Sequence, residues 1–83
     1  MTSTPTFPNH IDASVLQNEA DAARTAVDYA DWRDLRGPYR QQAIDRAAAW
    51  YHGGHEAAPE TLTRVALWRV LEREFRFAPR ISA

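Results

Sequence analysis

Apolar side chains recur with helical spacing in the first half of the chain. From Ala13 to Arg36 there is no proline or glycine. At about 100° per residue, one stripe is formed by Leu16, Ala20, Ala23, Val27 and Ala30, and it is widened by Val15, Ala22, Ala26 and Tyr29. The opposite side carries polar and charged residues: Gln17, Asp21, Arg24, Asp28 and Asp31. The pattern predicts an amphipathic helix over about residues 13–36, with Asp12 as its N-cap.

A second amphipathic stretch follows the pair Gly37-Pro38. Glycine is favoured just after a helix and proline at the first position of one, so this pair predicts a helix end and a new helix over about residues 38–52. One face of that helix is apolar and consists of Tyr39, Ala43, Ala47 and Trp50, with Ile44, Ala48 and Tyr51 beside it. The glycine-containing segment HGGHEAAP then predicts a loop.

A third helix is predicted over about residues 59–77, with Pro59 in its first turn. Its apolar residues form two sides. The bulkier side, which we predict to be core, consists of Leu67, Trp68, Leu71 and Phe75, and the other consists of Leu62, Val65, Ala66 and Val70. Because one side is enough to close a three-helix bundle, the second side is predicted to stay exposed and to need a partner.

The predicted fold is all-α, a small three-helix bundle with an extended N-terminal arm. Residues 1–11, which include Pro5 and Pro8, form the arm, and residues 12–83 form a single domain. A chain of 83 residues buries only about 60% of the surface that it exposes when unfolded. With no cysteine there is no disulfide to compensate, so packing or association has to supply the stability.

Composition narrows the partners and the compartment. The absence of cysteine favours a reducing, cytoplasmic setting, and the first residues do not have the pattern of a secretory signal. No apolar run approaches the roughly 20 residues that span a bilayer, so no membrane partner is predicted. The net charge is −1 and all ten basic residues are arginine, which is typical of GC-rich coding sequences such as those of some bacteria and phages. Arginine also suits protein contacts, because it stacks on rings and forks onto carboxylates.

Motifs for chemistry are weak. The strongest local motif is His52, His55 and Glu56, with His10 if the arm folds back, which could surround a metal ion, but their spacing does not match the helical HExxH pattern. The alternative is a solvated helix end in which His52 complements the helix dipole. No serine lies in a strained turn and the aspartates of the first helix form an ordinary solvated face, so we predict no enzyme activity, no metal and no cofactor.

Trp32 lies about 160° from Leu16 on the helical wheel, so it should not point into the core beside Val27 and Ala30. One interpretation is a satellite cluster with Leu35 and Tyr39; the other is a contact surface for a partner. The predicted partner-binding residues are Trp32, Arg33, Arg36 and Tyr39 at this corner, and Leu62, Val65, Ala66, Arg69, Val70 and Arg73 on the third helix.

These features predict a small non-catalytic protein–protein interaction module, a regulator or inhibitor that occupies a partner's surface and also associates with itself as a homodimer. The alternative is a regulator that binds nucleic acid through the third helix, whose arginines are Arg64, Arg69, Arg73, Arg76 and Arg80. Against it, Glu72 and Glu74 are expected to interrupt the basic face. A further alternative is that the acidic side of the first helix imitates DNA phosphates, but its excess of acid is modest.

Overall fold

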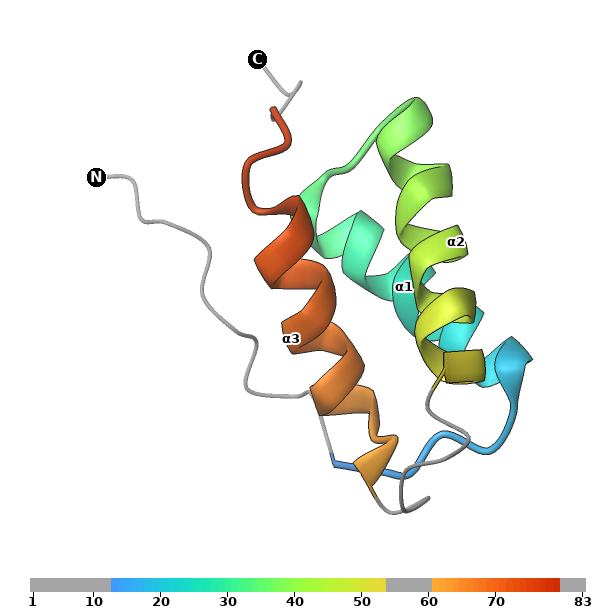
Figure 1. Ribbon diagram of the computed structural model, residues 1–83. Helices are drawn as coiled ribbons and strands as arrows, with labels where there is room; N and C mark the ends of the chain where they lie inside the picture. Colours follow the sequence, from blue (N-terminus) through green and yellow to red (C-terminus); the bar gives the residue numbers. More distant parts are fainter. Residues whose placement is uncertain (1–12, 54–60, 80–83) are drawn as a thin grey trace.

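Three helices make up the part of the chain described by the computed structural model, residues 13–53 and 61–79 (Figure 1). They are α1 (Glu19–Arg33), α2 (Pro38–Gly53) and α3 (Arg64–Phe75). Each helix contacts the other two, and α1 crosses behind α2 in the view of Figure 1. This arrangement is a small all-α three-helix bundle, as the sequence predicts. The expected arm, residues 1–11, lies outside the described residues.

The first helix begins at Glu19, six residues later than predicted. Its N-cap is Asn18 and not Asp12: the Asn18 side chain accepts a hydrogen bond from the backbone N–H of Asp21 at 2.8 Å. The residues before it pair with the start of α3, since the N–H of Leu16 donates to the carbonyl of Leu62 at 2.7 Å and that of Arg64 to the carbonyl of Ser14 at 2.9 Å. Backbone groups used in this pairing are not available for a helix.

The corner between α1 and α2 differs from the prediction in its first half. The first helix ends at Arg33 and not at Arg36, because Asp34 adopts the left-handed conformation with φ 64°. The N–H of Leu35 then donates back to the carbonyl of Ala30 at 2.9 Å, which closes the last turn. Gly37 also has a positive φ, 59°, and Pro38 is the first residue of α2, as predicted.

The third helix is shorter than predicted. It begins at Arg64 and ends at Phe75. Thr63 is its N-cap and accepts a hydrogen bond from the N–H of Ala66 at 3.1 Å. A threonine cap satisfies a backbone donor that the first turn would leave without a partner. Pro59, which was expected in the first turn, lies outside the described residues.

The core of the bundle confirms the predicted faces of α2 and α3 and corrects that of α1. Buried side chains include Leu67, Trp68, Leu71 and Phe75 on α3 and Ala43 and Ala47 on α2. On α1, Ala22, Ala26, Tyr29 and Ala30 are buried, whereas Ala20 is exposed and Ala23 and Val27 are half-buried. The buried face of α1 is thus rotated toward Tyr29, whose ring offers more surface to bury than the alanines of the expected stripe.

Trp32 packs on this core, so the expectation that it should not point toward it is wrong; the same cluster includes Leu35, with Tyr39 packed against it. The ring centroid of Trp32 lies 5.8 Å from that of Tyr29 and 5.6 Å from that of Trp68. Tyr29 and Trp68 meet edge to face, with centroids 5.3 Å apart and planes at 84°, a geometry that aromatic pairs favour. Trp32 is half-buried. The helical wheel placed it away from the core because the wheel was centred on the alanine stripe.

Candidate docking surface

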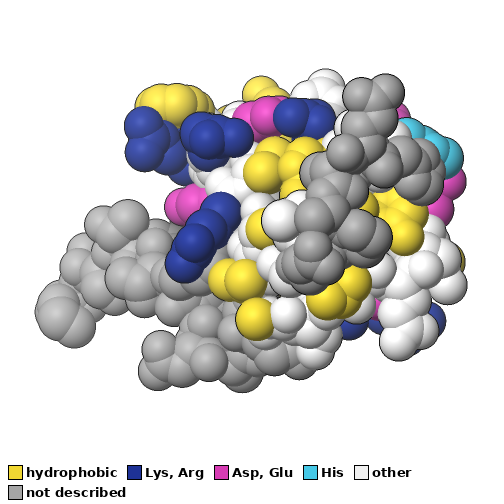
Figure 2. Space-filling view, turned by 60° about the horizontal axis from the view of Figure 1, so that its bottom comes forward, with side chains coloured by type: hydrophobic (Ala, Val, Ile, Leu, Met, Phe, Trp, Pro, Cys, Tyr) yellow, Lys and Arg dark blue, Asp and Glu magenta, His cyan; other side chains and the backbone are white. Residues whose placement is uncertain are grey.

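Accessible arginine and apolar side chains line α3 and the two residues that follow it. We call this surface the α3 outer face; it consists of Val65, Ala66, Arg69, Val70, Arg73, Arg76 and Phe77. The valines and the alanine are half-buried, the three arginines are exposed, and Phe77 is 79% exposed. In Figure 2, arginine side chains gather toward the left edge, the side on which α3 lies in Figure 1, with apolar side chains close by.

The acidic residues of α3 are bonded to the other two helices. The hydroxyl of Tyr29 on α1 donates to Glu72 Oε1 at 2.8 Å. On the other side, Arg46 Nε on α2 donates to both carboxylate oxygens of Glu74, at 2.8 and 2.9 Å. Glu74 is nevertheless exposed and Glu72 is half-buried, so acidic side chains stand beside the arginines of α3, as expected. Their carboxylates are already bonded to Tyr29 and Arg46.

Among the described residues, more exposed arginines than carboxylates have no oppositely charged side chain or side-chain hydrogen bond. Among residues 13–53 and 61–79, Arg24, Arg73 and Arg76 have no carboxylate of the described chain within ion-pair distance. Every described carboxylate except that of Asp28 takes part in an ion pair or a side-chain hydrogen bond. A net charge of −1 over the chain thus conceals a local excess of arginine.

Phe77 is held in its exposed position by a buried arginine. Arg33, at the end of α1, is only 6% exposed, and its Nη2 donates to the carbonyl oxygens of Arg76 at 2.7 Å and Ala78 at 2.6 Å. These two residues flank Phe77, and Ala78 is itself buried. The guanidinium of Arg76 lies 4.9 Å from the centre of the Phe77 ring, within the range of a cation–π contact. The backbone is thus fixed on both sides of an aromatic ring that points into solvent.

A shallow hollow of about 220 Å³ opens beside this ring. It is lined by Tyr39, Gln42, Glu74, Phe75, Phe77 and Ala78. Its volume is below the roughly 300 Å³ at which small-molecule pockets begin, but it is sufficient for a side chain of a partner. Two larger hollows, of about 390 and 410 Å³, have mostly polar linings at the α1–α2 corner and at the start of α1.

The corner residues predicted to bind a partner do not form one surface. Arg33 is buried and occupied by the two carbonyl groups, so its predicted exposure is wrong; a cation there complements the negative end of α3. Arg36 is exposed and its Nε lies 3.0 Å from Asp34 Oδ1. Tyr39 is half-buried and lines the hollow beside Phe77. Of this group, Tyr39 lies beside Phe77 and Arg33 contacts the backbone of Arg76.

The stripe predicted on the third helix agrees better with the structure. Val65, Ala66 and Val70 are partly accessible, and Arg69 and Arg73 border them. Leu62 is only 8% exposed, which contradicts its predicted place in the stripe, because it precedes the helix and its backbone pairs with Leu16. Phe77 was not predicted as a binding residue, and Arg76 was named only among the arginines of the nucleic-acid alternative. The arginine spacing 69, 73, 76 is a signal that could have added Arg76.

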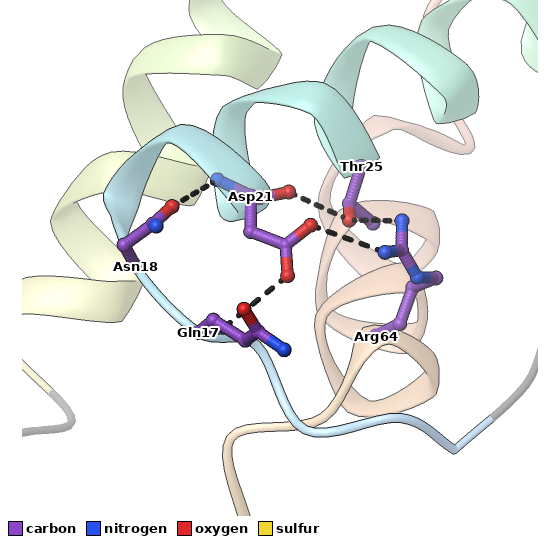
Figure 3. Close-up of polar contacts among 5 residues, drawn as sticks. All are labelled: Gln17, Asn18, Asp21, Thr25 and Arg64. Carbon is purple, nitrogen blue, oxygen red and sulfur yellow. Dashed lines mark hydrogen bonds and ion pairs between the residues drawn. The ribbon is translucent and has the colours of Figure 1, made fainter.

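The polar cluster at the start of α1 links this helix to the first turn of α3 (Figure 3). The two carboxylate oxygens of Asp21 accept from the N–H of Gln17 at 3.2 Å and from Arg64 Nη2 at 3.1 Å. Arg64 Nη1 also donates to the hydroxyl of Thr25, which in turn donates to the carbonyl of Asp21. These bonds join α1 to the first turn of α3 and use the donors and acceptors of the cluster within the chain itself.

The histidine motif is only partly described. His52 Nε2 lies 2.6 Å from Glu19 Oε1, so this histidine pairs with α1. His55, Glu56 and His10 lie outside the described residues. Within residues 13–53 and 61–79, there is no group of three or more histidine and acidic side chains that could hold a metal ion.

No protein-family model, curated protein or solved structure matches the chain. Within the described ranges 13–53 and 61–79, none of the helices combines the length and the apolar character needed to cross a bilayer.

Proposed function

We propose that this protein is a small non-catalytic binding module that docks on another protein through the α3 outer face. The observation that supports this best is Phe77, which is 79% exposed while the residues on both sides of it are fixed by Arg33. Burial of apolar surface yields about 25 cal/mol per Å², so a partner that covers this ring gains stability. Because the backbone is already fixed, little conformational entropy is lost on binding.

The arginines of the face give the interaction its orientation. Arg69, Arg73 and Arg76 are exposed beside half-buried Val70 and exposed Phe77. Aromatic residues and arginine are over-represented at the centres of protein interfaces, where the apolar part supplies affinity and the guanidinium groups select the partner. A module of this kind acts as a regulator or inhibitor by occupying its partner's surface, and we place this role in the cytoplasm.

Site-specific photocrosslinking in the host cell tests the docking surface. The photoreactive residue p-benzoylphenylalanine replaces Phe77 in one variant and Arg73 in a second. Matched controls carry it at Gln41 and Ala49, which are exposed on α2. We expect a crosslinked protein of defined mass from positions 77 and 73 and none from positions 41 and 49. The same product from all four positions, or from the α2 positions alone, contradicts the proposal.

Nucleic acid is the second candidate, and one observation favours it. The α3 outer face carries three arginines, and the carboxylates of the neighbouring Glu72 and Glu74 are bonded to Tyr29 and Arg46. Affinity for DNA or RNA would fall steeply with salt, with a log–log slope of about −0.9 per phosphate neutralised in a duplex. Tight binding of a labelled oligonucleotide with that dependence, lost in Arg73→Ala, would replace the protein partner by a nucleic acid.

Self-association through the same face is a further prediction, since the sequence leaves the partner open between another protein and a second copy. Molar mass in solution, measured by light scattering, tests it. A dimer that dissociates in Val70→Asp but not in Ala49→Asp would make the chain its own partner.

A further inference from the structure

We propose that the partner segment that docks on the α3 outer face is an acidic, amphipathic protein segment. Its carboxylates would face Arg73 and Arg76, and an apolar side chain would enter the hollow beside Phe77. This inference rests on the proposed function and adds the chemistry of the partner to it.

The charges of the α3 outer face favour an acidic partner. Arg73 and Arg76 are exposed, and no carboxylate of the described residues pairs with either of them. Residues three apart on a helix lie on the same side of it, with about 5–6 Å between their Cβ atoms. A partner helix with acidic residues three or four apart presents carboxylates at the same spacing. Each guanidinium can hold a carboxylate through two parallel hydrogen bonds.

The apolar part of the α3 outer face favours a partner that also has apolar side chains. The exposed ring of Phe77 forms one side of the hollow of about 220 Å³, and the side chains of Tyr39 and Phe75 form others. Glu74 also lines it, with its carboxylate paired with Arg46. Val70 is partly accessible on the same face. An aliphatic or aromatic side chain from the partner would lose water on several sides at once here. A purely acidic ligand would leave this part of the face unburied, so the segment has to be amphipathic.

Two other occupants fit the face less well. A second copy of the chain offers little acid, because Asp28 is the one described carboxylate without a hydrogen bond or an ion pair. A nucleic acid backbone offers charge to the arginines but nothing that buries Val65, Ala66 and Val70, which lie on the same face. An acidic amphipathic protein segment satisfies both kinds of side chain.

Selection from a random library of displayed 12-residue peptides on the immobilised full chain tests the inference. We expect the enriched peptides to combine Asp or Glu with an aromatic or aliphatic residue. The strongest of them, labelled with a fluorophore, is then titrated by anisotropy against four proteins: wild type, Arg73→Glu, Phe77→Ala and the control Arg24→Glu. Arg24 is exposed on α1 and, like Arg73, has no carboxylate partner among the described residues, so both glutamate variants change the charge equally.

The expected result is a loss of affinity of at least about tenfold in Arg73→Glu and in Phe77→Ala, with Arg24→Glu within twofold of wild type. Far-UV circular dichroism confirms that all four proteins are folded. Enriched peptides without acid, whose binding falls in Phe77→Ala but not in Arg73→Glu, overturn the acidic partner and leave the docking surface standing. Peptides that bind both variants as tightly as wild type overturn the docking surface as well. If no peptide is enriched, while a labelled oligonucleotide binds and Arg73→Glu abolishes that binding, the partner is a nucleic acid and not a protein segment.

Discussion

The two ends of α3 are attached to α1 by different means. At the first turn, Arg64 bonds to a carboxylate and a hydroxyl, those of Asp21 and Thr25, and about a quarter of its side chain is exposed. At the other end, Arg33 is buried and its hydrogen bonds go to two backbone carbonyls. The first attachment is shared among several polar groups close to water. Beyond the bond of Tyr29 to Glu72, the segment after α3 is attached by one cation, so the segment that presents Phe77 is the more vulnerable to a single change.

The largest effect is expected from Arg33→Met. This change keeps much of the apolar stem but leaves the carbonyls of Arg76 and Ala78 without their donor, and it should lower the free energy of unfolding by about 2–4 kcal/mol. Urea unfolding followed by tryptophan fluorescence measures it. The exposed control Arg24→Met should stay within about 0.5 kcal/mol of wild type. Equal stability of Arg33→Met and wild type would show that the buried cation is not needed.

A smaller effect is expected at the opposite end from Arg64→Ala. It removes the bonds to Asp21, which is partly accessible to water, and to the buried hydroxyl of Thr25, which keeps its bond to the carbonyl of Asp21. We therefore expect a loss of about 1–2 kcal/mol. Part of this loss should disappear in 1 M salt, because the pair with Asp21 is partly exposed and screened. Urea unfolding at two ionic strengths provides the comparison. A loss larger than that of Arg33→Met would reverse the order of the two ends.

The cap of α3 should contribute less again. Thr63→Ala removes the acceptor of the Ala66 N–H and is expected to cost about 1 kcal/mol. Thr63→Ser keeps the hydroxyl and serves as the control. Thermal unfolding of the two variants, followed by circular dichroism, separates the cap from the loss of a methyl group. If both variants melt at the same temperature, the hydroxyl contributes nothing.

The smallest effect on folding is expected from Phe77→Ala, although it removes the largest exposed side chain at this end of α3. Because the ring is 79% exposed, the free energy of unfolding should change by no more than about 0.5 kcal/mol. The same urea titration that measures Arg33→Met is used. A loss above 1 kcal/mol would assign the ring to the core and weaken its role in docking.

The sequence predicted the fold class and most of α2 and α3, because their apolar faces contain large side chains and a proline marks the start of α2. It failed at the start of α1, where Asp12 and Asn18 are equally good caps by composition. The choice between them depends on the pairing of residues 14–16 with the start of α3, a contact between distant parts of the chain. No local pattern contains that information.

The candidate site was predictable in part for the same reason. The arginines of the α3 outer face follow from helical spacing, but the positions of Glu72 and Glu74 depend on Tyr29 and Arg46, which lie on other helices. Arg33 was expected on the surface because arginine is seldom buried. Its burial requires the two carbonyls after α3, and helical periodicity cannot show them.

The contact between α1 and α2 has a consequence for which changes the chain can tolerate. Its fully buried residues are among the smallest available: Ala22, Ala26 and Ala30 on one helix, Ala43 and Ala47 on the other. In an ordinary core, the damaging substitutions are those that remove methyl groups and leave a cavity. At these five alanines nothing is left to remove except by glycine, and each added methyl group would push the backbones apart. At the alanines of α1 and α2, the loss of stability should therefore increase with the size of the side chain that is introduced. Around Trp68, it should increase with the size of the side chain that is removed.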